Sequence, residues 1–160
     1  MAMTAPVPRI YIAASYSRKA ECKRLADCLR KHGAVITSEW LDLPQNAKTQ
    51  AQWAETDIEC MNQARGILFF SETPESGYMT GGRHFELGWM ARSGDKWLWI
   101  IGGTENVFHN LGRMRHYPNV IAWIREIIVP GMQSDRDTAN LLLEVADIAW
   151  LGRSQLQVVP

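Results

Sequence analysis

The sequence lacks the features that mark membrane proteins, disulfide-rich proteins and proteins that bind charged polymers. No purely apolar run is longer than Trp97–Ile101, whereas a membrane-spanning helix needs about 20 such residues. The chain has only 3 cysteines and no CxxC pair, which argues against both a disulfide framework and a zinc knuckle. Its 17 basic residues balance 17 acidic residues, so no field of one sign favours a nucleic-acid backbone or an anionic membrane. We therefore expect a protein whose partner is a small molecule, with no nucleic-acid polymer and no membrane.

Several short signatures are missing as well. Neither GxxxxGK[ST] nor GxGxxG occurs, which weakens the case for ATP or NAD as a ligand. Residues 1–8 contain no basic segment followed by a long apolar one, so they are predicted to form a flexible tail and not an export signal. These absences predict a cytoplasmic protein that needs no metal and no other cofactor.

What the sequence does contain is an alternation of β-rich runs and segments with helical periodicity. A length of 160 residues with 46% hydrophobic content is typical of a single domain, here 1–160. The strands predicted from the apolar runs are 9–14, 34–40, 66–71, 96–101 and 119–124. The predicted helices are 18–32, 50–64, 82–93 and, within the C-terminal helical segment 134–152, residues 136–151.

Strands that alternate with helices indicate βαβ units with right-handed crossovers. The predicted fold is therefore α/β, a flavodoxin-like or Rossmann-like doubly wound parallel sheet of five strands in the order 2-1-3-4-5, with helices on both faces. Ligands bind such sheets at the carboxyl ends of the strands where the winding reverses, which lies between the first and third strands.

The loop after the first strand combines hydroxyl groups with a cation. It contains Ser15, Ser17 and Arg18 and leads directly into a helix. Hydroxyls, free backbone N–H groups and a guanidinium at one point can bind an anion. Taken alone, the motif is better explained by a serine that caps the helix and a solvated arginine. Its position where the winding reverses favours the anion site.

The loop after the third strand, residues 71–82, is long for a connection between a strand and a helix. Loops of this length are usually functional. Its last two residues, Gly81 and Gly82, allow the backbone to approach a ligand closely. We expect both glycines to contact the substrate.

Glu86 follows this loop and is predicted to lie in the first turn of the third helix, where the helix dipole favours an ionised carboxylate. An ionised acid can act as a nucleophile. Arg83 and His84 precede it and are predicted to bind substrate. The alternative is that Glu86 only satisfies the amides at the helix N-terminus, which explains most glutamates in such positions.

A second carboxylate, Asp57, falls within the apolar stripe of the helix at 50–64, on the side opposite Glu55 and Glu59. A buried aspartate needs a partner, which can be an arginine, a backbone amide or a substrate. Two carboxylates suit glycosidic chemistry, in which Glu86 attacks the sugar carbon while Asp57 or His84 protonates the leaving base.

These motifs together resemble the nucleoside 2-deoxyribosyltransferase-like superfamily, which includes nucleoside-monophosphate N-glycosidases, and in particular a poorly characterised bacterial and phage branch that carries GGRH. The resemblance covers roughly residues 9–124, and the order and spacing of the motifs are more specific than any one of them. The matching segments are Tyr11–Ser15 for "YLAGP", Asp57, 66–70, Gly81-Gly82, Glu86–Gly88 for "ELGxA", and 102–109 for "VGPRENxFH".

The resemblance implies a flavodoxin-like enzyme that cleaves or exchanges the base of a nucleoside or nucleoside 5′-monophosphate. Glu86 would take up the sugar, and Asp57 and Tyr11 would contact substrate. Active sites would be shared within a homodimer or larger homo-oligomer, with Asn106 and His109 reaching a neighbour's site, although a loop histidine is more often simply solvated.

Substrate and acceptor stay open at this point. The serine- and arginine-containing first loop is closer to the monophosphate N-glycosidases, which favours hydrolysis of a nucleotide. Two alternatives remain, a nucleotide-binding or sensing module without turnover and an NAD-cleaving enzyme similar to TIR domains.

Overall fold

A computed structural model describes residues 8–72 and 81–148. Within them, five parallel strands form one sheet in the order β2-β1-β3-β4-β5, which confirms the predicted fold class and strand order. The strands are β1 (Arg9–Ala13), β2 (Val35–Ile36), β3 (Gly66–Phe70), β4 (Trp97–Ile101) and β5 (Met114–Tyr117).

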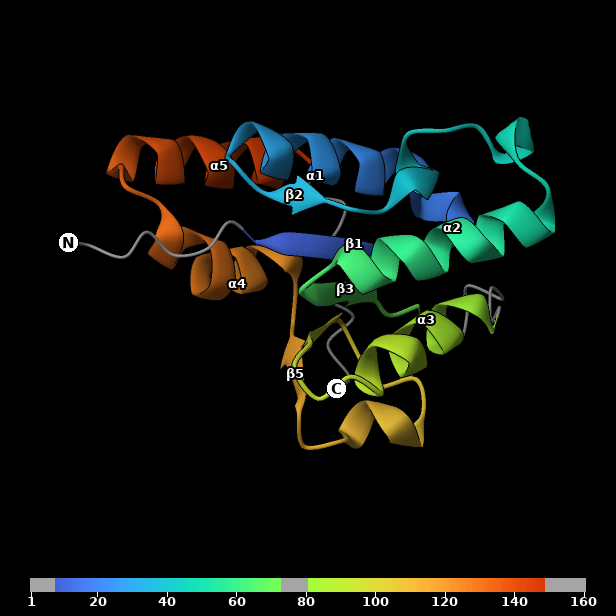
Figure 1. The fold of residues 1–160 in the computed structure, drawn as a ribbon. Coiled ribbons are helices and arrows are strands. Elements are labelled where there is room, and N and C mark those ends of the chain that lie inside the picture. Colours follow the sequence, from blue (N-terminus) through green and yellow to red (C-terminus); the bar gives the residue numbers. More distant parts are fainter. Residues whose placement is uncertain (1–7, 73–80, 149–160) are drawn as a thin grey trace, which may run out of the picture.

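Helices cover both faces of the sheet (Figure 1). Successive residues of β1 alternate between the faces: Ile10 and Ile12 belong to one buried cluster, and Tyr11 and Ala13 belong to the other. The first cluster packs against α1 (Lys19–Lys31), α4 (Val120–Trp123) and α5 (Asp135–Asp147), and the second against α2 (Gln50–Gln63) and α3 (Gly82–Ala91).

The second strand is shorter than predicted, because only Val35–Ile36 of the segment 34–40 pairs with β1. From Ser38 onward, side chains of this segment form hydrogen bonds with the backbone of β1. The Ile12 N–H donates to Ser38 Oγ at 2.5 Å, and Trp40 Nε1 donates to the Ile12 carbonyl at 3.0 Å. The chain leaves the sheet at this point and forms a short 3-10 helix, Glu39–Leu41.

The prediction of a fifth strand over 119–124 is wrong. Val120–Trp123 is the helix α4, and the strand lies just before it at Met114–Tyr117. The Asn119 side chain caps the helix by accepting a hydrogen bond from the Ala122 N–H at 2.9 Å. A short apolar run is compatible with either a buried strand or a buried helix, and the capping asparagine favours the helix.

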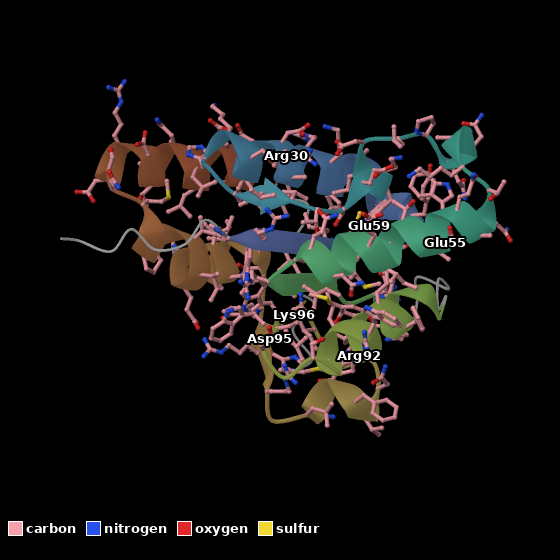
Figure 2. The ribbon with its side chains drawn as sticks, in the orientation of Figure 1. Arg30, Glu55, Glu59, Arg92, Asp95 and Lys96 are labelled. Carbon is pink, nitrogen blue, oxygen red and sulfur yellow. The ribbon has the colours of Figure 1, made fainter. Side chains whose placement is uncertain are left out.

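The remaining helices lie within or close to the predicted ranges. The capping box of Thr49 and Gln52 begins α2. Figure 2 labels Glu55 and Glu59 on α2, and both are exposed, as the predicted polar face requires. No helix in 8–72 or 81–148 is long and apolar enough to cross a membrane. Most of the predicted tail 1–8, most of the loop 71–82 and the end of the helical segment 134–152 lie outside the described residues.

Candidate active site

A cavity of about 410 Å³ lies beside the carboxyl end of β1, next to the N-terminus of α3. The strand order predicts a ligand at the carboxyl ends of the strands where the winding reverses, and the cavity lies there. Among the residues predicted for the site, Asp57, Gly82, Arg83 and Glu86 line it. The other lining residues are Ala14, Tyr16, Trp40, Leu43, Gln45, Gln50, Trp53 and Ala54.

The two carboxylates both line this cavity, close to the Tyr11 hydroxyl. Tyr11 is fully buried in β1 and donates a hydrogen bond to Glu86 Oε1 at 2.9 Å. Burial and the charges of Glu86 and Asp57 raise the Tyr11 pKa well above its ordinary value, so this hydroxyl keeps its proton and acts as a donor. β1, α2 and α3 thus bring Tyr11, Asp57 and Glu86 together.

The charge state of Glu86 differs from the prediction. α3 begins at Gly82, with no acidic residue in its first turn, so Glu86 lies beyond the reach of the free helix N-terminus. Burial, followed by the charge of Asp57, raises its pKa to about 8, although the Tyr11 hydrogen bond and the charge of Arg83 oppose this rise. A pKa of about 8 favours the protonated form of Glu86 at neutral pH.

Asp57 is half-buried on α2, as expected for an aspartate within the apolar stripe. Burial raises its pKa, whereas the nearby Tyr11 hydroxyl and the charge of Lys48 lower it. Its Oδ1 atom is buried, and within the described part of the chain it has no hydrogen-bond partner and no ion pair with a basic residue. A buried carboxylate oxygen without a partner is energetically unfavourable, and a ligand in the cavity can supply the missing donor.

Aromatic side chains also line the cavity, and sequence reasoning did not identify them as site residues. Tyr16 and Trp40 lie with ring centroids 6.5 Å apart. The Trp53 indole N–H donates to the Gln45 carbonyl at 2.9 Å, which fixes the plane of the ring. Trp53 looked like a core residue of the α2 stripe, because periodicity alone cannot separate a core face from the wall of a cavity.

The loop predicted to bind an anion is satisfied by its own neighbours. Arg18 Nη2 pairs with Glu21 at 2.8 Å, and Arg18 Nη1 lies 3.7 Å from Glu72. The Ser15 and Ser17 hydroxyls lie 2.9 Å apart, and Ser15 makes no side-chain capping bond. In this arrangement two carboxylates balance the guanidinium, so a phosphate would have to compete with Glu21 and Glu72.

A second polar network links α3 to the loop after β4. Arg83 Nη1 donates to the Phe70 carbonyl at 3.0 Å and to Glu105 at 2.8 Å, and the Arg83 and Glu105 side chains are only 3% and 5% exposed. Glu105 Oε2 also lies 3.1 Å from His84 Nε2. This network fixes the Arg83 side chain, and part of Arg83 also lines the cavity. Glu105 was not predicted as a site residue, although it lies in the segment 102–109 that matches "VGPRENxFH".

The other residues predicted from the same loop complete this network and do not line the cavity. Asn106 Nδ2 donates to His84 Nδ1 at 3.1 Å. His109 Nδ1 accepts a hydrogen bond from the Glu105 N–H at 3.3 Å, and burial lowers the His109 pKa.

Gly81 is the N-cap of α3, and the space where a side chain would begin at Gly81 or Gly82 is open.

Strand order, helices on both faces and a cavity where the winding reverses define a doubly wound α/β protein of the flavodoxin-like class. No family model and no curated protein matches the chain. Among solved structures, the chain is similar to the CMP N-glycosidase BcmB of Clostridium botulinum, with a TM-score of 0.53 and 17% identity, over 76% of this chain and 98% of that one. The similarity shows that the two chains share a fold.

Proposed function

We propose that the protein cleaves the N-glycosidic bond of a nucleoside or a nucleoside 5′-monophosphate through a glycosyl-enzyme ester at Glu86. The observation that carries the proposal is the pair of carboxylates, Glu86 and Asp57, around the buried Tyr11 hydroxyl at the edge of the cavity. The glycosidase fold of a structure similar to this one supports the same chemistry.

The raised pKa values of Glu86 and Asp57 suit a pair that shares one proton near neutral pH. In the reactive arrangement Asp57 carries that proton and Glu86 is ionised. The Glu86 carboxylate attacks C1′ of the sugar, and the C–N bond breaks with its electron pair passing to the base. Asp57 donates its proton to the departing base.

The second half of the reaction regenerates the pair. Asp57, now ionised, accepts a proton from water as the water oxygen attacks C1′, and the bond to Glu86 breaks. A second base in place of water gives base exchange. We favour water as the acceptor, because the first loop with Ser15, Ser17 and Arg18 resembles that of the nucleotide-hydrolysing branch.

The cavity fits a nucleoside in size and lining. Its volume of about 410 Å³ lies within the range of roughly 300 to 1,000 Å³ that small-molecule sites occupy. Trp40, Trp53 and Tyr16 offer ring faces on which a base can stack, and this places the sugar toward the carboxylates. The N-terminus of α3 at Gly81 and Gly82 is the proposed position of a 5′-phosphate.

Chromatographic assay of base release tests the proposal. Matched nucleosides and 5′-monophosphates of each base, as ribo- and deoxyribo- forms, are incubated with the wild type, with Glu86→Gln and with Glu59→Gln, which alters an exposed acid on the outer face of α2. We expect release by the wild type and by Glu59→Gln only. Release by Glu86→Gln at the wild-type rate would refute the nucleophile assignment.

A nucleotide sensor without turnover is the second candidate, because a carboxyl group with its pKa raised to about 8, as in Glu86, is a poor nucleophile at neutral pH. Calorimetry with the same compounds separates the two functions. Tight binding without product, unchanged in Glu86→Gln, would favour the sensor.

We further propose a homo-oligomer. Phe85 on α3 is 56% exposed, and Val107 and Phe108 on the short helix Val107–Asn110 are 76% and 68% exposed. The two elements are joined through His84 and Asn106. Light scattering of the wild type and of Phe108→Asp tests whether this apolar surface lies between subunits.

A further inference from the structure

A cluster of metal-ligating side chains lies away from the cavity, between α1 and α5. These two helices lie side by side on the same face of the sheet (Figure 1). Cys28 and His32, at the C-terminal end of α1, meet Glu144 of α5. One ligand atom from each residue can be chosen so that all three lie within 4.8 Å of one another.

The spacing of these atoms is close to that of a tetrahedral site. Bonds of about 2.0 to 2.3 Å place the ligands of a zinc ion roughly 3.3 to 3.8 Å apart. Cys28 Sγ lies 3.5 Å from one carboxylate oxygen of Glu144, Oε2, and His32 Nε2 lies 4.0 Å from the other, Oε1. With one atom from each residue, the distances stay within 4.8 Å. Cys28 and His32 are four residues apart, so they occupy one helix face a turn apart. Small side-chain rotations can bring all three atoms onto one ion.

His32 is the independent sign of a ligand. Its side chain is only 9% exposed, and its Nε2 atom is buried and makes no hydrogen bond within the described part of the chain. A buried imidazole nitrogen without a partner is unfavourable. This nitrogen faces Glu144 across a gap of 4.0 Å, which is too long for a hydrogen bond and suits an ion placed between the two groups.

We propose that Cys28, His32 and Glu144 bind a divalent transition-metal ion, with zinc as the expected occupant. Thiolate, imidazole and carboxylate together favour zinc over magnesium or calcium, which prefer oxygen ligands alone. The Cys28 thiol loses its proton to solvent on binding, and water completes the coordination. Lys31 Nζ contacts Glu144 in the metal-free chain, but its side chain is 65% exposed and can move aside.

The proposed ion would join the C-terminal end of α1 to α5. α1 runs antiparallel to the strands, so its C-terminal end lies near the amino ends of the strands. The cavity lies at their carboxyl ends. The role is therefore to hold the last described helix against the sheet, separate from base cleavage. The search for CxxC could not find such a site, because Glu144 lies 116 residues after Cys28.

Cobalt and zinc titrations of the full chain, without a histidine tag and after treatment with a chelator, test the proposal. We expect one Co²⁺ per chain with a near-ultraviolet thiolate charge-transfer band that zinc abolishes. The band should be absent in Cys28→Ser and present in Cys60→Ser, which removes a buried thiol elsewhere. Zinc should raise the Tm of the wild type.

Glu144→Gln and His32→Gln complete the experiment, with circular dichroism to show that each variant is folded. Loss of a group that only hydrogen-bonds to a metal ligand weakens metal binding about 10- to 100-fold. Loss of a direct ligand should therefore raise the Kd of the metal at least that much. Glu144 is partly exposed, and its variant should fold even if Cys28→Ser does not. A wild type without the band, or a Glu144→Gln variant with unchanged Kd, would overturn the proposal.

Discussion

Replacement of Tyr11 by phenylalanine tests the proton-sharing pair directly. The Tyr11 hydroxyl donates to Glu86 at 2.9 Å and lowers the Glu86 pKa. A hydrogen bond to a charged group contributes about 1.5 to 3 kcal/mol, and a pKa change of one unit corresponds to about 1.4 kcal/mol. Because the donor is a neutral hydroxyl, we take the lower end and expect the Glu86 pKa to rise by about one unit in Tyr11→Phe.

The sign of the effect follows from the proposed mechanism, in which only the singly protonated pair is active. A pKa of about 8 for Glu86 predicts that kcat/KM of the wild type falls as the pH rises through about 8, when the last proton leaves the pair. In Tyr11→Phe this alkaline limb should move to about pH 9, so that kcat/KM at pH 9 is about half of its plateau instead of about one tenth.

The assay is the initial rate of base release over the pH range of about 5 to 10, with Tyr117→Phe as the control. Tyr117 donates to Glu126 at 3.0 Å and does not line the cavity. Phenylalanine keeps the packing of the buried Tyr11 ring, so the variant should fold. An alkaline limb that stays at its wild-type position, or moves to lower pH, would refute the pair.

Four further predictions follow from the same structure. Asp57→Asn should remove the alkaline limb and lower kcat about 10²- to 10⁴-fold, the usual contribution of a general acid, and pH profiles check this. Glu86 keeps its proton to about pH 8 in the folded chain, so the folded state binds more protons than the unfolded state and stability should fall by up to about 1.4 kcal/mol per pH unit between about pH 5 and 8. Urea titrations should show a weaker dependence in Glu86→Gln. Glu105→Gln removes the negative charge beside the buried Arg83 guanidinium and should lower the free energy of unfolding by about 3 kcal/mol, at the lower end because Arg83 keeps the Phe70 carbonyl. Trp53→Ala should raise KM roughly tenfold, as loss of a stacking platform does, with little change in kcat.

The fold was predictable because the sequence pattern is consistent over most of the chain. Short apolar runs alternate with amphipathic segments, and this pattern has few solutions other than a parallel sheet with helices on both faces. The errors occurred where a side chain replaced a backbone interaction. Ser38 ends β2 by bonding to the Ile12 peptide group, and Asn119 converts an apolar run into α4.

The candidate site was predictable in its position but not in its electrostatics. The apolar stripe of α2 indicated a partly buried Asp57, which the structure confirms. The pKa of Glu86 depends on burial and on Asp57 from another helix, so no local pattern reveals it. Arg18 and Arg83 looked like free cations, because the positions of Glu72 and Glu105 beside them exist only in the folded chain.

The segment between β2 and α2 has a consequence for how this protein can change. It contributes Trp40, Leu43 and Gln45 to the cavity wall, and neither carboxylate belongs to it. Under the proposed function, part of the base-binding wall is thus encoded apart from the residues proposed to break the bond. A homologue could exchange this segment to recognise another base while Tyr11, Asp57 and Glu86 keep the same chemistry, which makes the segment the natural target for redirecting specificity.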